Sequence, residues 1–384
     1  MRACAASYGW AAVPALSVFD NATGLPVLPW RVCFHNDTSK VERFSLEVQR
    51  RADVRSGARA SLEESVAVRR PNAVLAALPD LCPDCILQLG ASPALAPATR
   101  AWLDRAFSGH NAAEKVVVQP GRARVDDDFA TSLRVEATPR TFARAAYGEA
   151  FPSSRLLRPL LAAGAAADAA LHETLGRGFS EPHIARAVTE ACHRQDAGLF
   201  VSNSMPIRDV DRFGLPVRAE ANRGLAGIDG VVATALGYAE NHASNTTYLL
   251  IGDQALLHDA GSLRCVKEGA GRLRIVLIDN DGGGIFSFLP LATNPAGIEA
   301  DEVVREEDFD LLFGARHGTD FVQLVQAHGL VAKRASSAAD FETLLDDPSV
   351  DVIVATPEVQ RSENVAIHRA LEEPLIEAAR NSIQ

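Results

Sequence analysis

The chain lacks the features that mark several protein classes. None of its apolar runs is long enough to cross a bilayer, so we expect no membrane span. Its six cysteines are scattered and do not form the spacing of a disulfide framework, which favours a reduced intracellular compartment. It has no excess of basic residues: the net charge of −11 argues against nucleic acid or an anionic membrane surface as the main partner.

The sequence also has little that indicates a structural zinc site. Cys82 and Cys85 form one CxxC pair, but no second Cys/His pair accompanies it. What remains is the composition of an ordinary globular protein, with 47% apolar and 23% charged residues. A chain of 384 residues with this composition predicts two or three domains.

The hydrophobic pattern divides the chain into three regions. Residues 1–65 carry no clear periodicity and read as an irregular segment, a linker or a partial domain. Within 66–160, the apolar runs CILQLG and EKVVVQPG flank the helical spacing of SPALAPATRAWLDRAF. This strand–helix–strand order predicts a smaller α/β domain. Residues 161–384 form the third region, which begins with an Ala-rich helix.

The third region alternates between helical and strand patterns. We expect strands at 198–204, 246–253, 273–280 and 351–356, and helices at 182–195, 231–241, 259–269 and 364–381. Strands that alternate with helices predict a doubly wound parallel sheet covered on both faces.

Four unusual loops follow the predicted strands. They are SNSMPIRD (202–209), EANRGLAGIDG (220–230), GDQALLHD (252–259) and DNDGGG (279–284). Ligands of such sheets bind at the carboxyl ends of the strands. These loops therefore predict the functional site, and the polar segment 202–209 is expected to be a loop.

Two of these loops carry candidate metal ligands. Asp253 closes one strand and Asn280 closes another, 27 positions later. A carboxylate and an amide oxygen at adjacent strand ends can share one hard cation, most simply Mg²⁺. The glycines at 282–284 leave room for backbone groups to approach the ion and its phosphates.

Taken together, the loops resemble one enzyme family. The Gly-Asp…Asn spacing is similar to the thiamine diphosphate motif. LFVSNSMPIRD, NRGLAGIDG, GDQALLHD and NDGGGIFSFLP together resemble the 2-succinyl-5-enolpyruvyl-6-hydroxy-3-cyclohexene-1-carboxylate synthases of menaquinone and phylloquinone biosynthesis. The resemblance is strong from about Asp196 to the C-terminus and weaker over 70–140. It implies a transferase that joins the succinyl unit of 2-oxoglutarate, after decarboxylation, to isochorismate.

The resemblance also implies a cofactor site. The cofactors would be thiamine diphosphate and Mg²⁺ (or Mn²⁺). The metal would be held by Asp253, Asn280 and the Gly282 carbonyl. Ile228 would be the apolar support that keeps the cofactor bent. Further cofactor contacts would come from Asp196, Gly252, Gln254 and Ala255, although Asp196 can equally serve only to end the preceding helix.

The same resemblance implies a substrate site. Ser204 and Arg208 would contact a carboxylate of the substrate, Arg223 would be a second carboxylate clamp, and Leu289 would line the pocket. Both substrates are dicarboxylates, and Arg offers the planar fork that carboxylates favour.

The chain departs from the family in two respects. Family members begin with another α/β domain, which binds the pyrimidine half of the cofactor and supplies a catalytic glutamate; the sequence shows no such domain, so no catalytic residue is named. Ala255 replaces an expected small hydroxyl residue, and Gln254 is also atypical.

These departures leave three alternatives open. A second copy of the chain or a partner chain could complete the site, or the chain could be a fragment of a longer enzyme. The chain could be a non-catalytic binding or regulatory subunit. It could also be a different thiamine diphosphate decarboxylase or carboligase. Cytoplasm and plastid both fit a quinone pathway.

Overall fold

The computed structural model describes residues 70–78, 85–89, 97–108, 112–120, 130–139, 141–142, 157–176, 178–217, 219–241, 245–269, 272–289, 292, 306–359 and 361–383, with four short strands before them. The expectation for residues 1–65 lies outside the described residues apart from those strands. The chain divides into two compact units, Met1–Glu173 with Glu372–Gln384, and Thr174–Leu371. Each unit is described by itself.

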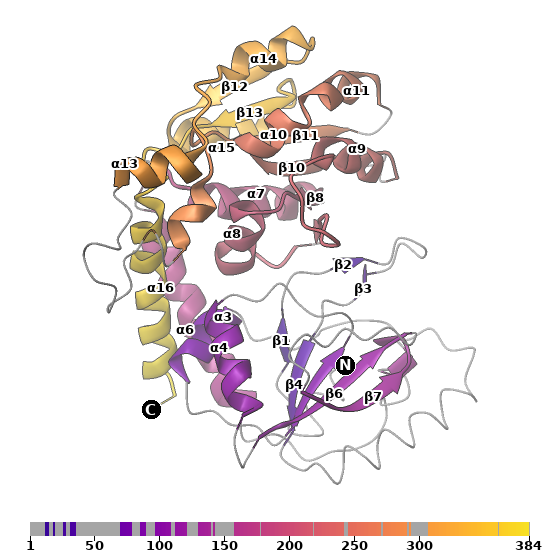
Figure 1. Cartoon of the computed structure of the whole chain (residues 1–384), viewed down its shortest axis with the longest axis vertical. Coiled ribbons are helices and arrows are strands. Elements are labelled where there is room, and N and C mark those ends of the chain that lie inside the picture. The colour runs from indigo at the N-terminus through magenta and orange to yellow at the C-terminus, as the bar shows by residue number, and fades with distance from the viewer. Residues whose placement is uncertain are drawn as a thin grey trace. The chain divides into compact units, whose positions relative to one another are not determined.

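The first unit contains a five-stranded mixed sheet in the order β1-β4-β5-β6-β7 (Figure 1). The β1–β4 and β4–β5 pairs are antiparallel, whereas β5–β6 and β6–β7 are parallel. The predicted strand–helix–strand order is present as β5, α4 and β6; β7 was not predicted. The bounds of the elements that begin in this unit are β1 Ala12–Pro14, β2 Val18–Phe19, β3 Pro26–Val27, β4 Arg31–His35, α3 Pro71–Ala77, β5 Cys85–Leu89, α4 Pro97–Ala106, β6 Glu114–Gln119, β7 Thr131–Glu136 and α6 Leu157–Leu175.

The second unit is built on a six-stranded sheet in the order β12-β13-β11-β10-β8-β9. Every neighbouring pair in this sheet is parallel, so the predicted parallel sheet is confirmed. The strands are β8 Gly198–Val201, β9 Ala219–Glu220, β10 Thr247–Gly252, β11 Leu273–Ile278, β12 Ala332–Ala335 and β13 Val352–Ala355.

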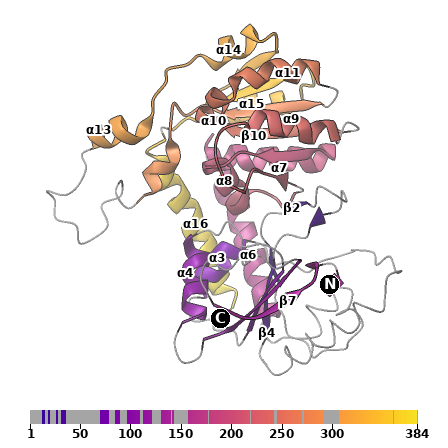
Figure 2. The same cartoon turned by 45° about the vertical axis from the view of Figure 1, so that its right-hand side comes forward.

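Helices cover both faces of this sheet (Figures 1 and 2). Alternate strand residues such as Leu249, Ile251 and Ile275 share a buried apolar cluster with residues of α9, α10, α11 and α14. Helices α7 and α15 pack against each other and against strands of the sheet. The bounds of these helices are α7 Glu181–Gln195, α9 Val231–Asn241, α10 Asp253–His258, α11 Leu263–Glu268, α14 Phe321–Ala327 and α15 Ala338–Asp346.

One predicted loop is a helix. Residues Met205–Phe213 form α8, which the sequence analysis placed in a polar loop. Its charged residues alternate with Ile207, Val210 and Phe213, which recur every third position and are buried, so the apolar stripe was hidden among polar neighbours. The remaining elements are η1 Ala260–Ser262, η2 Gly284–Phe288, α13 Glu306–Phe309, η4 Asp310–Gly314 and α16 Asn364–Asn381.

Among the described residues, no helix combines the length and apolar character needed to cross a membrane.

Candidate functional site

The carboxyl ends of β8, β10 and β11 meet at one edge of the parallel sheet. Val201 pairs with Leu250, and Gly252 pairs with Ile278, so the loops that follow these strands begin side by side. Helix α7 runs into β8, and its first turn therefore lies at the same edge. The register thus brings the predicted loops together with the start of α7.

Asp253 is a deeply buried acid, with 3% of its surface exposed. Its Oδ1 accepts the backbone N–H of Gln254 (2.6 Å), and its Oδ2 accepts the backbone N–H of Gly282 (2.8 Å). The ring nitrogen Nε2 of His317 lies 3.1 Å from the same Oδ2. Burial raises the pKa of Asp253, while these hydrogen bonds lower it.

The tautomer of His317 follows from its other contact. Its Nδ1 accepts the backbone N–H of Thr319 (3.0 Å), so in the neutral ring the proton is on Nε2 and is donated to Asp253. Of the carboxylate's roughly four lone pairs, three are then used within the described residues, and the free one is on Oδ1. Asp253 can therefore bind a cation without losing these partners.

Asn280 also presents an oxygen atom that a cation could bind. Its Nδ2 donates to Oε1 of Glu181 (2.7 Å). Its Oδ1 is buried and, within the described part of the chain, has no hydrogen-bond partner. A buried acceptor without a donor costs free energy unless a ligand or a cation satisfies it. Asp253 and Asn280 thus fit the predicted metal site on chemical grounds.

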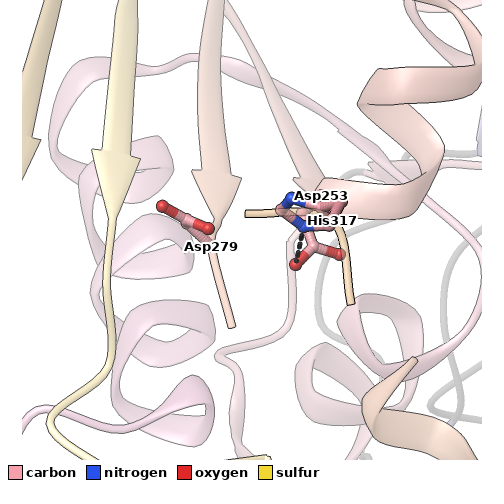
Figure 3. A group of neighbouring side chains, drawn as sticks. All are labelled: Asp253, Asp279 and His317. Atoms are coloured by element: carbon pink, nitrogen blue, oxygen red, sulfur yellow. Dashed lines mark hydrogen bonds and ion pairs between the residues drawn. The ribbon is translucent and has the colours of Figure 1, made fainter. Parts of the chain in front are cut away.

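A second group of possible ligands lies nearby. One atom each of Asp253, Asp279 and His317 falls within 4.8 Å of the other two. Figure 3 shows Asp279 at the end of its strand, whereas Asp253 and His317 are joined by a hydrogen bond. Asp279 accepts a hydrogen bond from Arg334 (2.8 Å), and both nitrogens of His317 are engaged. Asp279 and His317 thus already have partners within the protein, whereas the Asn280 oxygen has none within the described residues.

The three glycines at 282–284 have a packing role that the sequence did not reveal. Gly282 has a positive φ of 143°, and a Cβ there would overlap the carbonyl oxygen of Gly314. A Cβ on Gly283 would lie 2.9 Å from the carbonyl oxygen of Phe313. Arg361 donates to the carbonyl of Asp281 and to the carboxylate of Asp310, which ties the loop to the same segment. The glycines let this loop pack closely against η4.

The predicted carboxylate-binding arginines form a positive cluster. Arg223 donates to Oδ1 of Asn203 (2.6 Å), and Arg208 donates to the carbonyl of Ser204 (2.6 Å). Burial lowers the pKa of Arg208, and the positive charges of Arg223 and Arg212 lower it further. Burial also lowers the pKa of Arg223. Like charges held together in this way favour an anionic ligand that bridges them.

The loops that carry these groups contain strained backbone. Ser204, at the start of α8, has a φ of 73°, Ala226 has 56° and Asp281 has 57°. Positive φ values cost free energy for residues other than glycine and often occur where a site constrains the chain. Three of the four predicted loops therefore hold a residue in this conformation.

The other predicted residues lie in different surroundings. Ile228 packs against the apolar cluster above the sheet, and Ala255 is buried within it. The side chain of Gln254 donates to the carbonyl of Ala315 (2.7 Å), and Leu289 is 41% exposed after η2. Gly252 begins α10 with an extended backbone.

Asp196 is not brought to this edge. It ends α7 with a positive φ of 49°, just before β8 begins, so it lies at the opposite, amino-terminal edge of the sheet. Asn245 donates to its carbonyl (3.0 Å). Of the two roles considered for Asp196, the structure gives it the end of the helix.

Sequence reasoning missed two residues of the site, His317 and Glu181. Glu181 is 2% exposed, and burial and the nearby Asp209 raise its pKa to about 8. A signal for Glu181 existed: it precedes a proline at the start of a helix that leads into β8, and the start of such a helix lies at the carboxyl edge of the sheet. His317 is 64 positions from Asp253 and had no comparable signal.

Comparisons with known proteins agree with the predicted family. No family model matches the chain. A 2-succinyl-5-enolpyruvyl-6-hydroxy-3-cyclohexene-1-carboxylate synthase of Rubrobacter xylanophilus is 36% identical over 301 residues, which are 75% of this chain and 49% of that protein. The synthase of the same name from Geobacillus kaustophilus is 34% identical over 305 residues, 76% of this chain and 49% of that protein. That of Myxococcus xanthus is 39% identical over 198 residues, 50% of this chain and 32% of that protein.

The chain spans about half the length of the first two of these relatives. The resemblance carried by the four loops is confirmed: over three quarters of its length, this chain is a homologue of the 2-succinyl-5-enolpyruvyl-6-hydroxy-3-cyclohexene-1-carboxylate synthases.

Proposed function

We propose that this chain carries the metal–diphosphate site of a decarboxylating carboligase that uses thiamine diphosphate and Mg²⁺. In this proposal it acts in menaquinone or phylloquinone biosynthesis and adds the succinyl unit of 2-oxoglutarate to isochorismate. The observation that carries the proposal is Asn280 Oδ1, which has no hydrogen-bond partner among the described residues and lies at the strand end next to the buried Asp253 carboxylate. The names of the homologous synthases support the reaction.

In this proposal each group of the site has one role. Asp253 and Asn280 hold Mg²⁺, and the Gly282 carbonyl is the third protein ligand. When bound, thiamine diphosphate supplies the electron sink that decarboxylation of a 2-oxo acid requires. Ile228 would be the apolar support of the cofactor.

The arginines act on the substrates. Arg208 and Arg223 hold substrate carboxylates, which neutralises two guanidinium groups that otherwise repel each other. Ser204 and Leu289 complete the substrate pocket. A partner chain or a second copy would supply the pyrimidine-binding part.

The first test is cofactor binding by the whole chain, measured by calorimetry with thiamine diphosphate in excess Mg²⁺. We expect saturable binding that Asp253→Ala weakens by about 100-fold or more, because the ion loses its charged ligand. Asp279→Ala is the matched control, since Asp279 lies at the same sheet edge but pairs with Arg334. If Asp279→Ala abolishes binding and Asp253→Ala does not, the metal assignment is wrong.

A second candidate function is a binding subunit without catalysis. Neither Gln254 nor Ala255 has a hydroxyl group to offer the diphosphate; the Gln254 amide donates to the Ala315 carbonyl, and Ala255 is in the core. Exchange of the thiazolium C2 proton into D₂O, followed by NMR with the chain alone and with a chain that supplies the pyrimidine-binding part, separates the two functions. Strongly accelerated exchange in either sample supports the enzyme, whereas binding without acceleration in both favours the subunit.

A further inference from the structure

Glu181 is a buried acid that the proposed function does not use. It occupies the first turn of α7, after the N-cap Ser180, whose side chain accepts the backbone N–H of His183. Asp209 and Asp253 lie close enough to act on it electrostatically. A carboxyl group enclosed near two others is costly to bury, so its contacts are worth examining.

The contact of Glu181 that bears on the site is with Asn280. Oε1 of Glu181 accepts the Nδ2–H of Asn280 at 2.7 Å. Gly284 closes over this pair, because a Cβ there would lie 3.0 Å from Nδ2 and 3.8 Å from Oε1. The pair is therefore held within the protein.

The contact decides which end of the amide is available. An asparagine side chain can turn either its oxygen or its NH₂ group to a neighbour, and only the oxygen can bind a cation. Since Nδ2 is engaged by Glu181, Oδ1 is the atom left buried and unpaired within the described residues. The opposite orientation would present two N–H groups to the ion.

We propose that Glu181 is a positioning residue, which holds the amide of Asn280 with its oxygen turned to the metal ion. This inference rests on the proposed function. It assigns Glu181 no contact with the ion, the cofactor or the substrate. Glu181 acts only through its hydrogen bond to Asn280. Residues that hydrogen-bond to metal ligands orient those ligands in the same way in other proteins.

The test is Mn²⁺ binding in the presence of thiamine diphosphate, with free Mn²⁺ quantified by electron paramagnetic resonance. Glu181→Leu keeps roughly the size of the side chain but removes the oxygen that accepts the Nδ2–H of Asn280, so the orientation of the amide is no longer selected. We expect Mn²⁺ affinity to fall by about 10- to 100-fold. Glu190→Leu, on the same helix with its carboxylate paired to Arg186, is the control and should bind as the wild type does.

The same Glu181→Leu substitution, made in the Asn280→Asp protein, separates positioning from a merely structural role. In Asn280→Asp, an oxygen faces the ion whichever way the side chain turns, so adding Glu181→Leu should leave Mn²⁺ affinity unchanged or raise it. A structural role would weaken both backgrounds alike, and that result overturns the inference. Thermal unfolding by circular dichroism checks that each variant is folded.

The remaining outcomes distinguish the inference from the function it rests on. If Asp253→Ala loses Mn²⁺ but Glu181→Leu binds it as the wild type does, Glu181 does not position Asn280 and the proposed function stands. If the wild-type chain binds no Mn²⁺ with thiamine diphosphate, both fall.

Discussion

The two ends of β10 and β11 hold buried polar groups of opposite character. At the amino-terminal end, Arg274 is 5% exposed and lies over the ring of Tyr248. Its guanidinium donates to the Tyr248 hydroxyl (2.7 Å) and to four backbone carbonyls. These belong to Leu344, Leu345, Asp347 and Val350. Each of its nitrogens has an acceptor, so this cluster is complete without a ligand.

At the carboxyl-terminal end, the cluster of Asp253, Asn280 and Glu181 is incomplete. Asn280 Oδ1 has no donor among the described residues, and Asp253 and Glu181 both have raised pKa values because they are buried. The same two strands thus end in a cluster that stabilises the fold and in one that is available to a ligand. The difference teaches that burial alone does not mark a site; here the distinguishing feature is an acceptor without a donor beside a buried carboxyl group.

The largest expected effect is on stability and comes from the complete cluster. Arg274→Met removes the donors to four carbonyls and a hydroxyl, and should lower the free energy of unfolding by about 3 kcal/mol or more. Urea denaturation measures this. Arg272→Met is the control: that residue is exposed and makes one contact of this kind, to the Pro348 carbonyl (2.9 Å), so the loss should stay below about 1 kcal/mol. Equal losses in the two variants would remove the distinction between the clusters.

The next effect falls on the incomplete cluster. Gly282→Ala forces a side chain onto a φ of 143° and into the Gly314 carbonyl, which should cost about 2 kcal/mol of unfolding free energy. Because Gly282 donates to Asp253, cofactor affinity should fall as well. Gly237→Ala, in the exposed middle of α9 with open space around it, should instead stabilise by about 0.5–1 kcal/mol. A Gly282→Ala protein as stable as the wild type would contradict the packing role.

A smaller effect on stability accompanies a loss of ligand binding. Arg223→Ala should weaken binding of 2-oxoglutarate or isochorismate about tenfold, the loss expected for one charged hydrogen bond. Its unfolding free energy should fall by about 1 kcal/mol, because the buried Asn203 loses the donor to its Oδ1. Arg264→Ala, an exposed arginine of α11 paired with Glu268, controls for a general loss of positive charge. Unchanged affinity for both substrates would withdraw the clamp role.

The smallest effect is a difference in thiol reactivity. Cys192 lies beside the start of β8, and burial raises its pKa to about 12, whereas Cys265 is exposed. Since the thiolate is the reactive form, Cys192 should stay protonated and unmodified by iodoacetamide at about pH 8. It should react only after unfolding, and peptide mass mapping distinguishes it from Cys265. Rapid modification of Cys192 in the folded chain would show that the amino-terminal end opens.

Much of this comparison could be predicted from the sequence. The apolar runs before Asp253 and Asn280 fixed the strands, and their spacing placed both residues at one sheet edge. Helix α9 was predicted with its observed bounds, Val231–Asn241, because its apolar period is regular. These features depend on local patterns, which one sequence contains.

The rest depends on contacts between distant segments. Glu181 and Asn280 are 99 positions apart, and neither residue type indicates that the two will meet. Arg274 reads as a polar interruption of a strand, because the carbonyls that satisfy it belong to residues 344–350. Which atoms remain unpaired is a property of the folded chain and has no local pattern.

Helix α7 contacts both clusters, one at each of its ends, and this affects how the region opens to solvent. It begins at Glu181, beside Asn280, and ends at Gln195, which accepts a hydrogen bond from the Tyr248 hydroxyl (2.8 Å). Fifteen residues of α-helix make a rod about 22 Å long, and this one links both clusters. We therefore expect the amide hydrogens of α7 and β10 to exchange with solvent as one cooperative unit. When the cofactor binds at the carboxyl-terminal end of the strands, exchange should slow along the whole of α7 and β10.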